Sequence, residues 1–387
     1  MRRLLLSSAP LLSTTFVLLE PPSYQERIRG VYENKIRQNA LPEKVFETFA
    51  SIKEGKKFYM TPADLFKALT PFNYSAATNY NFFKEREILI IKAVDANRDG
   101  KVSFSEYFFF IVLLSTPAKE LKRMFEVKGG KLNMGKFLEV MLEAKNKSPQ
   151  GKRLANSIAL DPRSTNITDR DFKESCSTLF EEFFSNKESI EWEEFKELRD
   201  KISEELLTYE FYSFEVENNC ISAEDFAKSL IAYMPTSLSD MYLSRLESLK
   251  VEGCVSLENY LAFMFVMQEA QLVQKKLLIE HAERGTLHEH HISKVLKSIC
   301  DNIEFCKNRN IKISDLQISI FMKLLDLDDS KSLEPNEIIN LVSSRGSQGT
   351  SQSANPNFGE VVNDFKRFLN SLLKFSGINP FFKVNED

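Results

Sequence analysis

The sequence predicts an all-α protein built from repeated helix–loop–helix units. Phenylalanine is abundant (32 copies), whereas glycine and proline are scarce (13 each), which suits closely packed helices better than a turn-rich β sandwich. A hydrophobic content of 43% with 27% charged residues is typical of a globular protein. A six-residue pattern also recurs along the chain, at intervals close to the length of one helix–loop–helix unit. At 387 residues the chain is long enough for two or three domains.

The repeated pattern is an apolar residue, four mostly small, polar or acidic residues, and a second apolar residue. An apolar helical pattern follows most copies, as expected where a loop turns into an exiting helix. We expect the first apolar residue to pair with a neighbouring loop and the last acid to cap the helix or bind metal. The second apolar residue should enter the core. The copies begin at Met60, Val102, Leu132, Ile167, Ile190, Ile221, Val255, Leu287 and Leu333.

One copy lies inside a complete metal-binding loop. The segment "DANRDGKVSFSE", Asp95 to Glu106, matches the pattern D-x-[DN]-x-[DN]-G-x5-E throughout. Calcium takes six to eight oxygen ligands, and alternate loop residues can direct their oxygens inward. Gly100 permits the sharp turn that a β-carbon would resist. We therefore predict an EF-hand calcium site. Its ligands are the side chains of Asp95, Asn97, Asp99 and Glu106, the carbonyl of Lys101, and Ser103 through water.

A second candidate loop is "DLDDSKSLEPNE", Asp326 to Glu337. All its oxygen positions are present, but Lys331 replaces the glycine. A non-glycine residue with positive φ costs on the order of 1 kcal/mol, which should weaken the site without abolishing it. The expected ligands are Asp326, Asp328, Ser330, the Ser332 carbonyl, Glu334 and Glu337.

The remaining loops lack the ligands of a calcium site. The segment from Glu126 to Lys136 is one residue short and ends in lysine, and "FSNKESIEWEE" and "EVENNCISAED" lack spaced acids at their start. We expect these loops to serve as structural partners, with Val102 pairing to Leu132.

Histidines and cysteines form no recognisable zinc or disulfide pattern. The four histidines fall in one span, and three of them lie at the predicted start of one exiting helix, without the spacing of a zinc site. The five cysteines are odd in number, scattered and without a CxxC, so we expect mostly buried or free thiols. The residues are His281, His288, His290 and His291, and Cys176, Cys220, Cys254, Cys300 and Cys306.

The ends of the chain differ from its centre. The first residues are basic, rich in Leu, Ser and Thr, and free of acids until Glu20, which fits a mitochondrial presequence somewhat better than a secretory signal. Near the C-terminus, a low-complexity stretch precedes an amphipathic helical pattern that could pack on the body, grip a partner or lie on a membrane. The expected divisions are a targeting segment at 1–22, an N-terminal domain at 23–80, an N-lobe EF-hand pair at 81–148, central and C-lobe EF-hand-like repeats at 149–345, a linker at 346–358, and a C-terminal helix and tail at 359–387.

From about Tyr24 onward the chain resembles a known family. The run "YENKIR" (Tyr32 to Arg37) is followed by "PEKVFETFAS", "FYMTPADLFKALTP", "VSFSEYFFFIVLLSTP" and "FMKLLDLDDSKSLEPNEI". Together these resemble the mitochondrial calcium uptake family, the EF-hand gatekeepers of the mitochondrial calcium uniporter. In animal members the loop after "LSTP" is the calcium-competent one. Here that loop is broken and the earlier one is intact, which resembles plant-like relatives and a divergent, protist-like branch. No cysteine follows Cys306 to make the C-terminal cross-link of animal members.

The resemblance implies a calcium sensor that covers the uniporter pore from the intermembrane-space side of the inner membrane and relieves the block when calcium binds. It also implies a homodimer or a heterodimer with a paralogue, with peripheral membrane contact. Calcium affinity should be roughly 10⁻⁷–10⁻⁵ M. The residues expected to face the partner are Arg27, Arg29, Tyr32, Lys35 and Arg37.

Two alternatives compete with this interpretation. One is a generic EF-hand adaptor or buffer without a channel partner. The other is a calcium-regulated enzyme. The sequence contains no P-loop, GxSxG or HExxH motif to support it. A net charge of −4 gives no reason to expect nucleic-acid binding.

Overall fold

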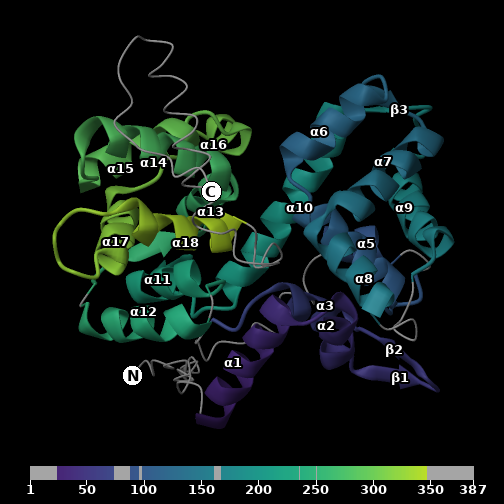
Figure 1. Ribbon diagram of the computed structural model, residues 1–387, viewed down its shortest axis with the longest axis horizontal. Helices are drawn as coiled ribbons and strands as arrows, with labels where there is room; N and C mark the ends of the chain where they lie inside the picture. Colours follow the sequence, from purple (N-terminus) through teal and green to yellow (C-terminus); the bar gives the residue numbers. More distant parts are fainter. Residues whose placement is uncertain are drawn as a thin grey trace, which may run out of the picture.

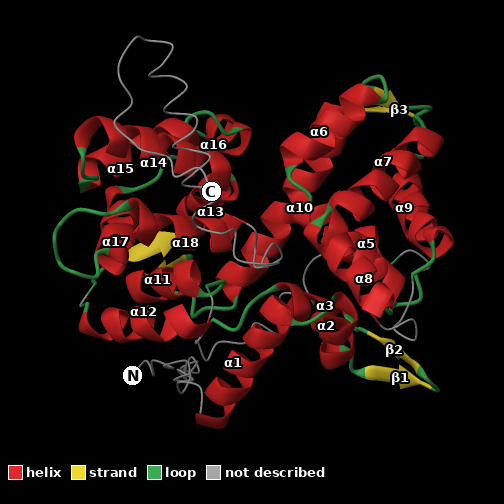
Figure 2. Ribbon diagram, in the orientation of Figure 1, coloured by secondary structure: helices red, strands yellow, loops and turns green. Residues whose placement is uncertain are grey.

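A computed structural model of the protein (Figure 1) describes residues 24–73, 88–95, 98–160, 167–234, 236–249 and 251–346. Helices make up most of these ranges, and the strands are short and lie between helices (Figure 2). The expected all-α class with short β pairings between loops is therefore confirmed. The targeting segment expected at 1–22 and the C-terminal helix expected at 359–387 lie outside the described residues, as does the expected linker after Gly346.

Two groups of helices are visible, and the long helix α10 runs from one to the other (Figure 1). The first group begins after an N-terminal helix, α1 (Tyr24–Asn39). It contains α2 (Pro42–Phe49), β1 (Ile52–Glu54), β2 (Lys57–Tyr59), α3 (Pro62–Leu69), α4 (Leu89–Val94), α5 (Phe104–Ser115), α6 (Ala118–Val127), β3 (Lys131–Leu132), α7 (Met134–Lys147), α8 (Pro149–Leu160), α9 (Asp169–Phe184) and β4 (Ile190–Glu191).

The second group follows α10 (Trp192–Tyr212). It contains β5 (Cys220–Ser222), α11 (Ala223–Ile231), α12 (Thr236–Ser248), β6 (Cys254–Ser256), α13 (Leu257–Gln268), α14 (Ala270–Arg284), α15 (Glu289–Cys300), α16 (Glu304–Arg309), α17 (Asp315–Leu325) and α18 (Pro335–Gly346).

Loops associate in antiparallel pairs through the first apolar residue of the repeated pattern. The sequence predicts that Val102 pairs with Leu132. Val102 does not form this pair. It exchanges two backbone hydrogen bonds with Met60, whose loop carries the β1–β2 hairpin (2.8 and 2.9 Å). That prediction was wrong because the loop nearest in sequence is not the nearest in space. Within the described residues the pairs are Met60–Val102, Leu132–Ile190, Ile221–Val255 and Leu287–Leu333.

The polar residues of the repeated pattern cap the exiting helices. Thr61 accepts from the N–H of Asp64 and Ser103 from that of Glu106, while each acid accepts in return from the backbone of its cap residue. One copy of the pattern differs, because Ile167 forms no β bridge in the described structure and leads into α9, an entering helix. The pattern "ITDRDF" there marks only a capped helix start, with Thr168 as the cap.

The buried apolar residues form two cores that meet within α10. The first core ends at Leu206 and the second begins at Leu207. Successive turns of one continuous 21-residue helix therefore belong to different cores. Because a regular helix is rigid over this length, α10 fixes the spacing of the two groups.

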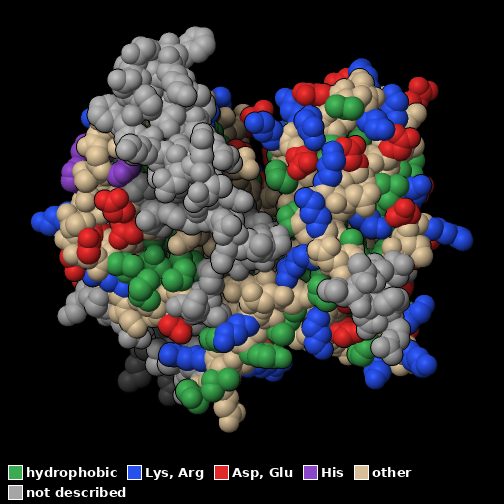
Figure 3. Space-filling model, in the orientation of Figure 1, with side chains coloured by type: hydrophobic (Ala, Val, Ile, Leu, Met, Phe, Trp, Pro, Cys, Tyr) green, Lys and Arg blue, Asp and Glu red, His purple; other side chains and the backbone are tan. Residues whose placement is uncertain are grey.

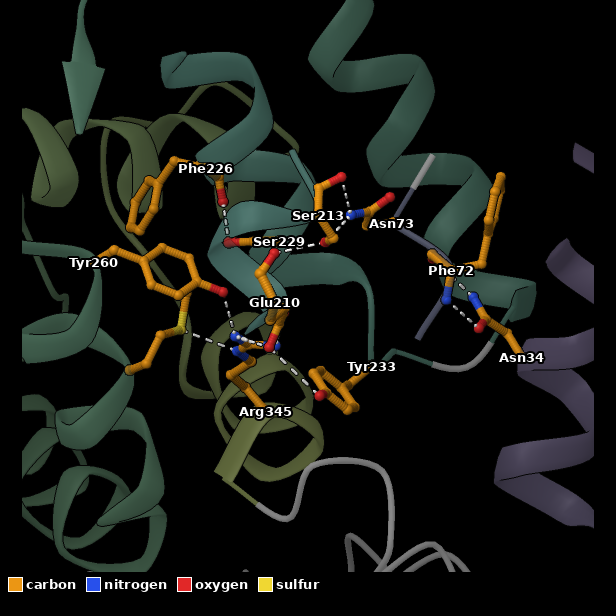
Figure 4. Close-up of polar contacts among 11 residues, drawn as sticks. Asn34, Phe72, Asn73, Glu210, Ser213, Phe226, Ser229, Tyr233, Tyr260 and Arg345 are labelled. Carbon is orange, nitrogen blue, oxygen red and sulfur yellow. Dashed lines mark hydrogen bonds and ion pairs between the residues drawn. The ribbon is translucent and has the colours of Figure 1, made fainter. Parts of the chain in front are cut away.

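A buried ion pair ties the last described helix to the end of α10. Arg345 of α18 donates to both carboxylate oxygens of Glu210 (2.7 and 3.0 Å), with side chains only 2% and 1% exposed. Tyr260 of α13 accepts from the same guanidinium at 3.1 Å (Figure 4). Two parallel hydrogen bonds and a third partner give this pair the satisfied geometry that a buried charge requires.

The same polar region continues to α1. The amide of Asn73 donates to the hydroxyl of Ser213 (2.5 Å), and the Ser213 hydroxyl donates to the carbonyl of Glu210 (2.6 Å). The backbone of Phe72, the residue before Asn73, exchanges two hydrogen bonds with the side chain of Asn34 on α1 (2.8 and 3.1 Å; Figure 4). We call this series from Arg345 to Asn34 the polar bridge. It connects the two ends of the described chain through the end of α10.

No helix among the described residues is long and apolar enough to cross a membrane.

Replacing Arg345 with Met should destabilise the second group of helices strongly, because the Glu210 carboxylate would stay buried without its partner. We expect a loss of about 3–5 kcal/mol in the free energy of unfolding, measured by urea denaturation. The control is Lys201→Met on α10, the helix that carries Glu210, where an exposed pair with Glu197 should contribute less than about 1 kcal/mol. Adding Glu210→Gln to Arg345→Met should restore part of the loss. Equal effects of Arg345→Met and Lys201→Met would contradict the role given to the buried pair.

Candidate calcium-binding loops and the α1 surface

The first candidate loop joins α4 to α5 and folds around one carboxylate. Asp95, at the C-terminal end of α4, accepts from the backbone N–H groups of Asp99 (3.2 Å) and Gly100 (3.0 Å). Gly100 has a φ of +77°, a conformation that glycine adopts without strain. The turn therefore lies where the sequence predicts it, and Asp95 is buried beneath it.

The second candidate loop joins α17 to α18 and repeats this hydrogen-bonding pattern. Asp326 accepts from the N–H groups of Ser330 (2.9 Å) and Lys331 (3.0 Å). Lys331 has a φ of +60°, so it adopts the conformation that glycine has in the first loop. The expected backbone strain is therefore present, and the loop keeps its shape in spite of it. Counted from Asp95 or Asp326 as position 1, φ is positive at positions 4 and 6 of both loops, at Arg98, Gly100, Asp329 and Lys331.

The glutamate at position 12 of each loop lies in the first turn of the exiting helix. Glu106 accepts from the backbone N–H of Ser103 at 2.7 Å, and Glu337 accepts from that of Glu334 at 2.8 Å. Glu106 is buried. In the second loop, the partial burial of Glu337 and the nearby carboxylates of Asp328 and Asp326 raise the pKa of Glu337. Helix capping thus holds each glutamate beside its loop. The same loop also carries the position-1 carboxylate, so both ends of the predicted ligand set belong to one loop.

The donor set of both loops fits a calcium ion. Carboxylate, hydroxyl and carbonyl oxygens alternate along each loop, and these are the ligands that calcium prefers. In the described residues no three His, Cys, Asp or Glu side chains are already gathered as a metal site, because the carboxylates bond to the loop backbone instead. Binding would therefore require the glutamate at position 12 to turn from the cap toward the loop. Of the predicted ligands, Asn97 lies outside the described residues.

The second loop is held by a neighbouring helix, which the sequence did not suggest. Arg245 of α12 donates to the carbonyl of Asp326 (2.8 Å) and to the carboxylate of Asp329 (3.1 Å). The paired loop contributes His288, whose Nδ1 lies 3.1 Å from the carbonyl of Lys331. No local pattern around Arg245 signals this contact, because its partners are distant in the sequence.

The histidines have a structural role. His288 is the N-cap of α15, and its backbone N–H donates to Nδ1 of His291 at 3.2 Å, so the two form a capping box. The structure agrees with the interpretation of His288, His290 and His291 as the start of an exiting helix, whereas His281 lies in the last turn of α14.

On α1 the residues expected to face a partner separate into two sets. Tyr32 is 58% exposed, the Arg29 side chain is 74% exposed, and Arg27 and Lys35 are exposed as well. Two further apolar side chains, Tyr24 (79% exposed) and Ile28 (53% exposed), lie two turns and one turn before Tyr32, respectively, on the same helix face. We call Tyr24, Arg27, Ile28, Arg29, Tyr32 and Lys35 the α1 surface.

Arg37 does not belong to the α1 surface. Its guanidinium donates to the carbonyl of Lys67 (2.8 and 3.0 Å) and lies 4.4 Å from the ring centre of Phe49 on α2. Burial lowers the pKa of Arg37 to about 10, opposed by the carboxylate of Glu33. The sequence placed Arg37 among the partner-facing residues because its charge gave no sign of these internal contacts.

Comparisons with known proteins agree on one group of relatives. The calcium uptake protein of Arabidopsis thaliana mitochondria is 24% identical over 348 residues, covering 84% of this chain and 67% of that protein. Human mitochondrial calcium uptake protein 1 is 22% identical over 369 residues, covering 88% of this chain and 74% of that protein. The chain is thus similar to mitochondrial calcium uptake proteins over most of its length. No protein-family model matches it.

Two solved structures share the fold of this chain. The apo structure of the mitochondrial calcium uniporter protein MICU2 aligns with a TM-score of 0.54 at 17% identity, covering 87% of this chain and 97% of that one. The apo crystal structure of EFHA2 aligns with a TM-score of 0.53 at 20% identity, covering 80% of this chain and 97% of that one. The resemblance found in the short motifs thus extends over most of the described structure.

Replacing Glu106 with Gln should abolish calcium binding at the first loop, because one of the two charged oxygens that close the coordination sphere would be lost. Isothermal titration calorimetry should then show one bound calcium ion in place of two. The matched control is Glu194→Gln, at the same position of the degenerate loop before α10. Two ions bound by the Glu106 variant would rule out this site.

Replacing Lys331 with Gly should tighten calcium binding at the second loop several-fold, since both the strained φ and a nearby positive charge are removed. The titration is best done in the Glu106→Gln background, so that only the second loop binds. A Lys331→Gln variant removes the charge and keeps a side chain at positive φ, which separates the two effects. No gain in affinity from the Gly variant would mean that Lys331 does not limit this site.

Proposed function

We propose that the chain is a calcium-sensing regulatory subunit that gates the mitochondrial calcium uniporter from the intermembrane-space side of the inner membrane. The observation that supports this most strongly is the shared geometry of the two loops, in which a position-1 carboxylate accepts from the N–H groups of positions 5 and 6. The relatives that cover most of the chain carry the name calcium uptake protein.

Calcium at the first loop would change the start of α5. To place both carboxylate oxygens on the ion, Glu106 must release the backbone N–H of Ser103, which it now caps. The helix that follows is buried on all sides, with Phe108, Phe109 and Phe110 fully enclosed. Because a packed core does not deform gradually, a shift of α5 must move its neighbours.

A continuous line of contacts leads from α5 to α1. The ring of Tyr107 lies 5.6 Å from that of Phe46 on α2, and Phe49 at the end of α2 carries the guanidinium of Arg37 on its face. Movement of α5 would therefore reach α1 through α2. In this role Arg37 positions α1 and leaves the exposed residues to contact the partner.

The second loop is connected to the same helix by another route. Its exiting helix α18 ends at the Arg345–Glu210 pair, and the polar bridge continues to Asn34 of α1. The α1 surface thus lies at the end of two connections that begin at the two calcium loops. This convergence supports a sensor in which calcium repositions one surface.

The chemistry of the α1 surface suits an acidic partner with apolar edges. Arg27, Arg29 and Lys35 supply positive charge, and Tyr24, Ile28 and Tyr32 supply exposed apolar area. Electrostatic complementarity of this kind favours fast and specific docking. We propose that this surface contacts an acidic surface at the pore entrance. We further propose that the protein acts as a homodimer or as a heterodimer with a paralogue.

The proposal predicts that loss of the protein allows mitochondrial calcium uptake at low external calcium, and that wild-type protein restores the block. In permeabilised cells, Glu106→Gln protein should keep uptake low even at high calcium, because the first loop can no longer respond. The paired substitution Arg27→Glu with Lys35→Glu should fail to restore the block while calcium binding stays normal. The control is Lys152→Glu, an exposed charge on α8.

Uptake that is the same at every calcium level, with or without the protein, would overturn the gating role. The chain would then be an EF-hand adaptor or buffer without a channel partner.

A further inference from the structure

Two cysteines from different loops meet at the β5–β6 pair. The register aligns Cys220 with Ser256 and Ser222 with Cys254, on either side of the Ile221–Val255 pair. In an antiparallel pair these four side chains lie on one face, because side chains alternate along each strand. Cys220 and Cys254 are diagonal neighbours there, within reach of each other in a twisted pair of strands.

The two cysteines occupy the same position of their respective loops. Each stands directly before the residue that forms the loop-to-loop pair, which is the position that supplies a backbone carbonyl to the ion in a calcium loop. On that face the two side chains interact, and the hydrogen bond between the thiols raises the pKa of Cys220. Cys254 is exposed and Cys220 half-buried, so a reagent in solution can reach the pair.

These two loops lack the side-chain ligands of a calcium site, so a bound ion does not join them. At position 1, where calcium loops carry aspartate, the loops have Phe214 and Ser248, and Asn259 stands at position 12 of the second. The backbone pairing of β5 with β6 is therefore the direct link between them.

The other cysteines of the described structure are placed differently. Cys300 and Cys306 also interact through their thiols, but both are buried within the second core. Cys176 is buried in the first core. Among the described cysteines, the Cys220–Cys254 pair alone combines interacting thiols with access from solvent.

We propose that Cys220 and Cys254 form a reversible disulfide that covalently joins the two metal-free loops of this pair. The oxidant is a low-molecular-weight or protein disulfide. The Cys254 thiolate attacks one sulfur of that disulfide and releases one thiol. The Cys220 thiolate then displaces the second thiol from the mixed disulfide. Overall, two protein thiols and one external disulfide give one protein disulfide and two external thiols, so electrons and protons balance.

The disulfide would restrain a helix that also contacts the second calcium loop. It fastens the segment before α11 to the segment after α12, and α12 carries Arg245 against Asp326 and Asp329. The redox state of the pair would therefore set how freely α12 moves. This inference does not depend on the gating role, because it concerns the thiols themselves.

The test uses the full-length reduced protein incubated with oxidised glutathione, followed by alkylation and peptide mapping by mass spectrometry. We expect one intramolecular disulfide joining Cys220 to Cys254, reversed by dithiothreitol, and a rise of several degrees in Tm. Cys254→Ser and Cys220→Ser should each lose both the cross-link and the rise in Tm. The double variant Cys300→Ser with Cys306→Ser serves as the matched control and should keep the cross-link.

Four results would each overturn the proposal. They are alkylation of both thiols after oxidation, glutathione retained on Cys254, a disulfide between two chains, and a cross-link at Cys300–Cys306 in place of Cys220–Cys254.

Discussion

The backbone pairing between loops is the constraint on which the rest of this structure depends. A single helix–loop–helix unit cannot bury its apolar face alone, and each unit here is joined to another through one residue that exchanges hydrogen bonds across the loops. This pairing places Val102 against Met60 and Leu333 against Leu287, so each calcium-type loop is held by a loop without calcium ligands. The degenerate loops are therefore structural parts of the sites, because they fix the backbone from which the ligands project.

The long helix α10 and the Arg345–Glu210 pair connect the two hydrophobic cores. Because α10 contributes to both cores, neither group of helices can turn without bending it or breaking its packing. The ion pair fixes the end of α18 at the same place, and the polar bridge carries that attachment to α1. A surface on α1 is thereby connected to both candidate calcium loops, although it touches neither.

The pair of loops at β5–β6 shows how a unit can keep its fold after losing its ligands. Its backbone pairing, its helix caps at Ser222 and Ser256 and its apolar position-8 residues are all retained. Only the inward oxygens are replaced, since capping and pairing depend on the backbone and on short polar side chains, whereas calcium binding depends on several carboxylates at once. The two thiols stand at position 7, which contributes its backbone carbonyl in a calcium loop, so its side chain is free to vary.

The sequence by itself determined the features that depend on neighbouring residues. The all-α class, the capped exiting helices and the two loops with alternating oxygens all follow from short spacings, as does the positive φ at Lys331, because turn geometry and capping are local. Only the tertiary structure decided which loops pair, that Arg37 turns inward, that Arg245 holds the second loop, and that Cys220 meets Cys254. These contacts join residues far apart in the chain, and which distant groups meet is set by the packing of two whole cores around α10, which no short pattern encodes.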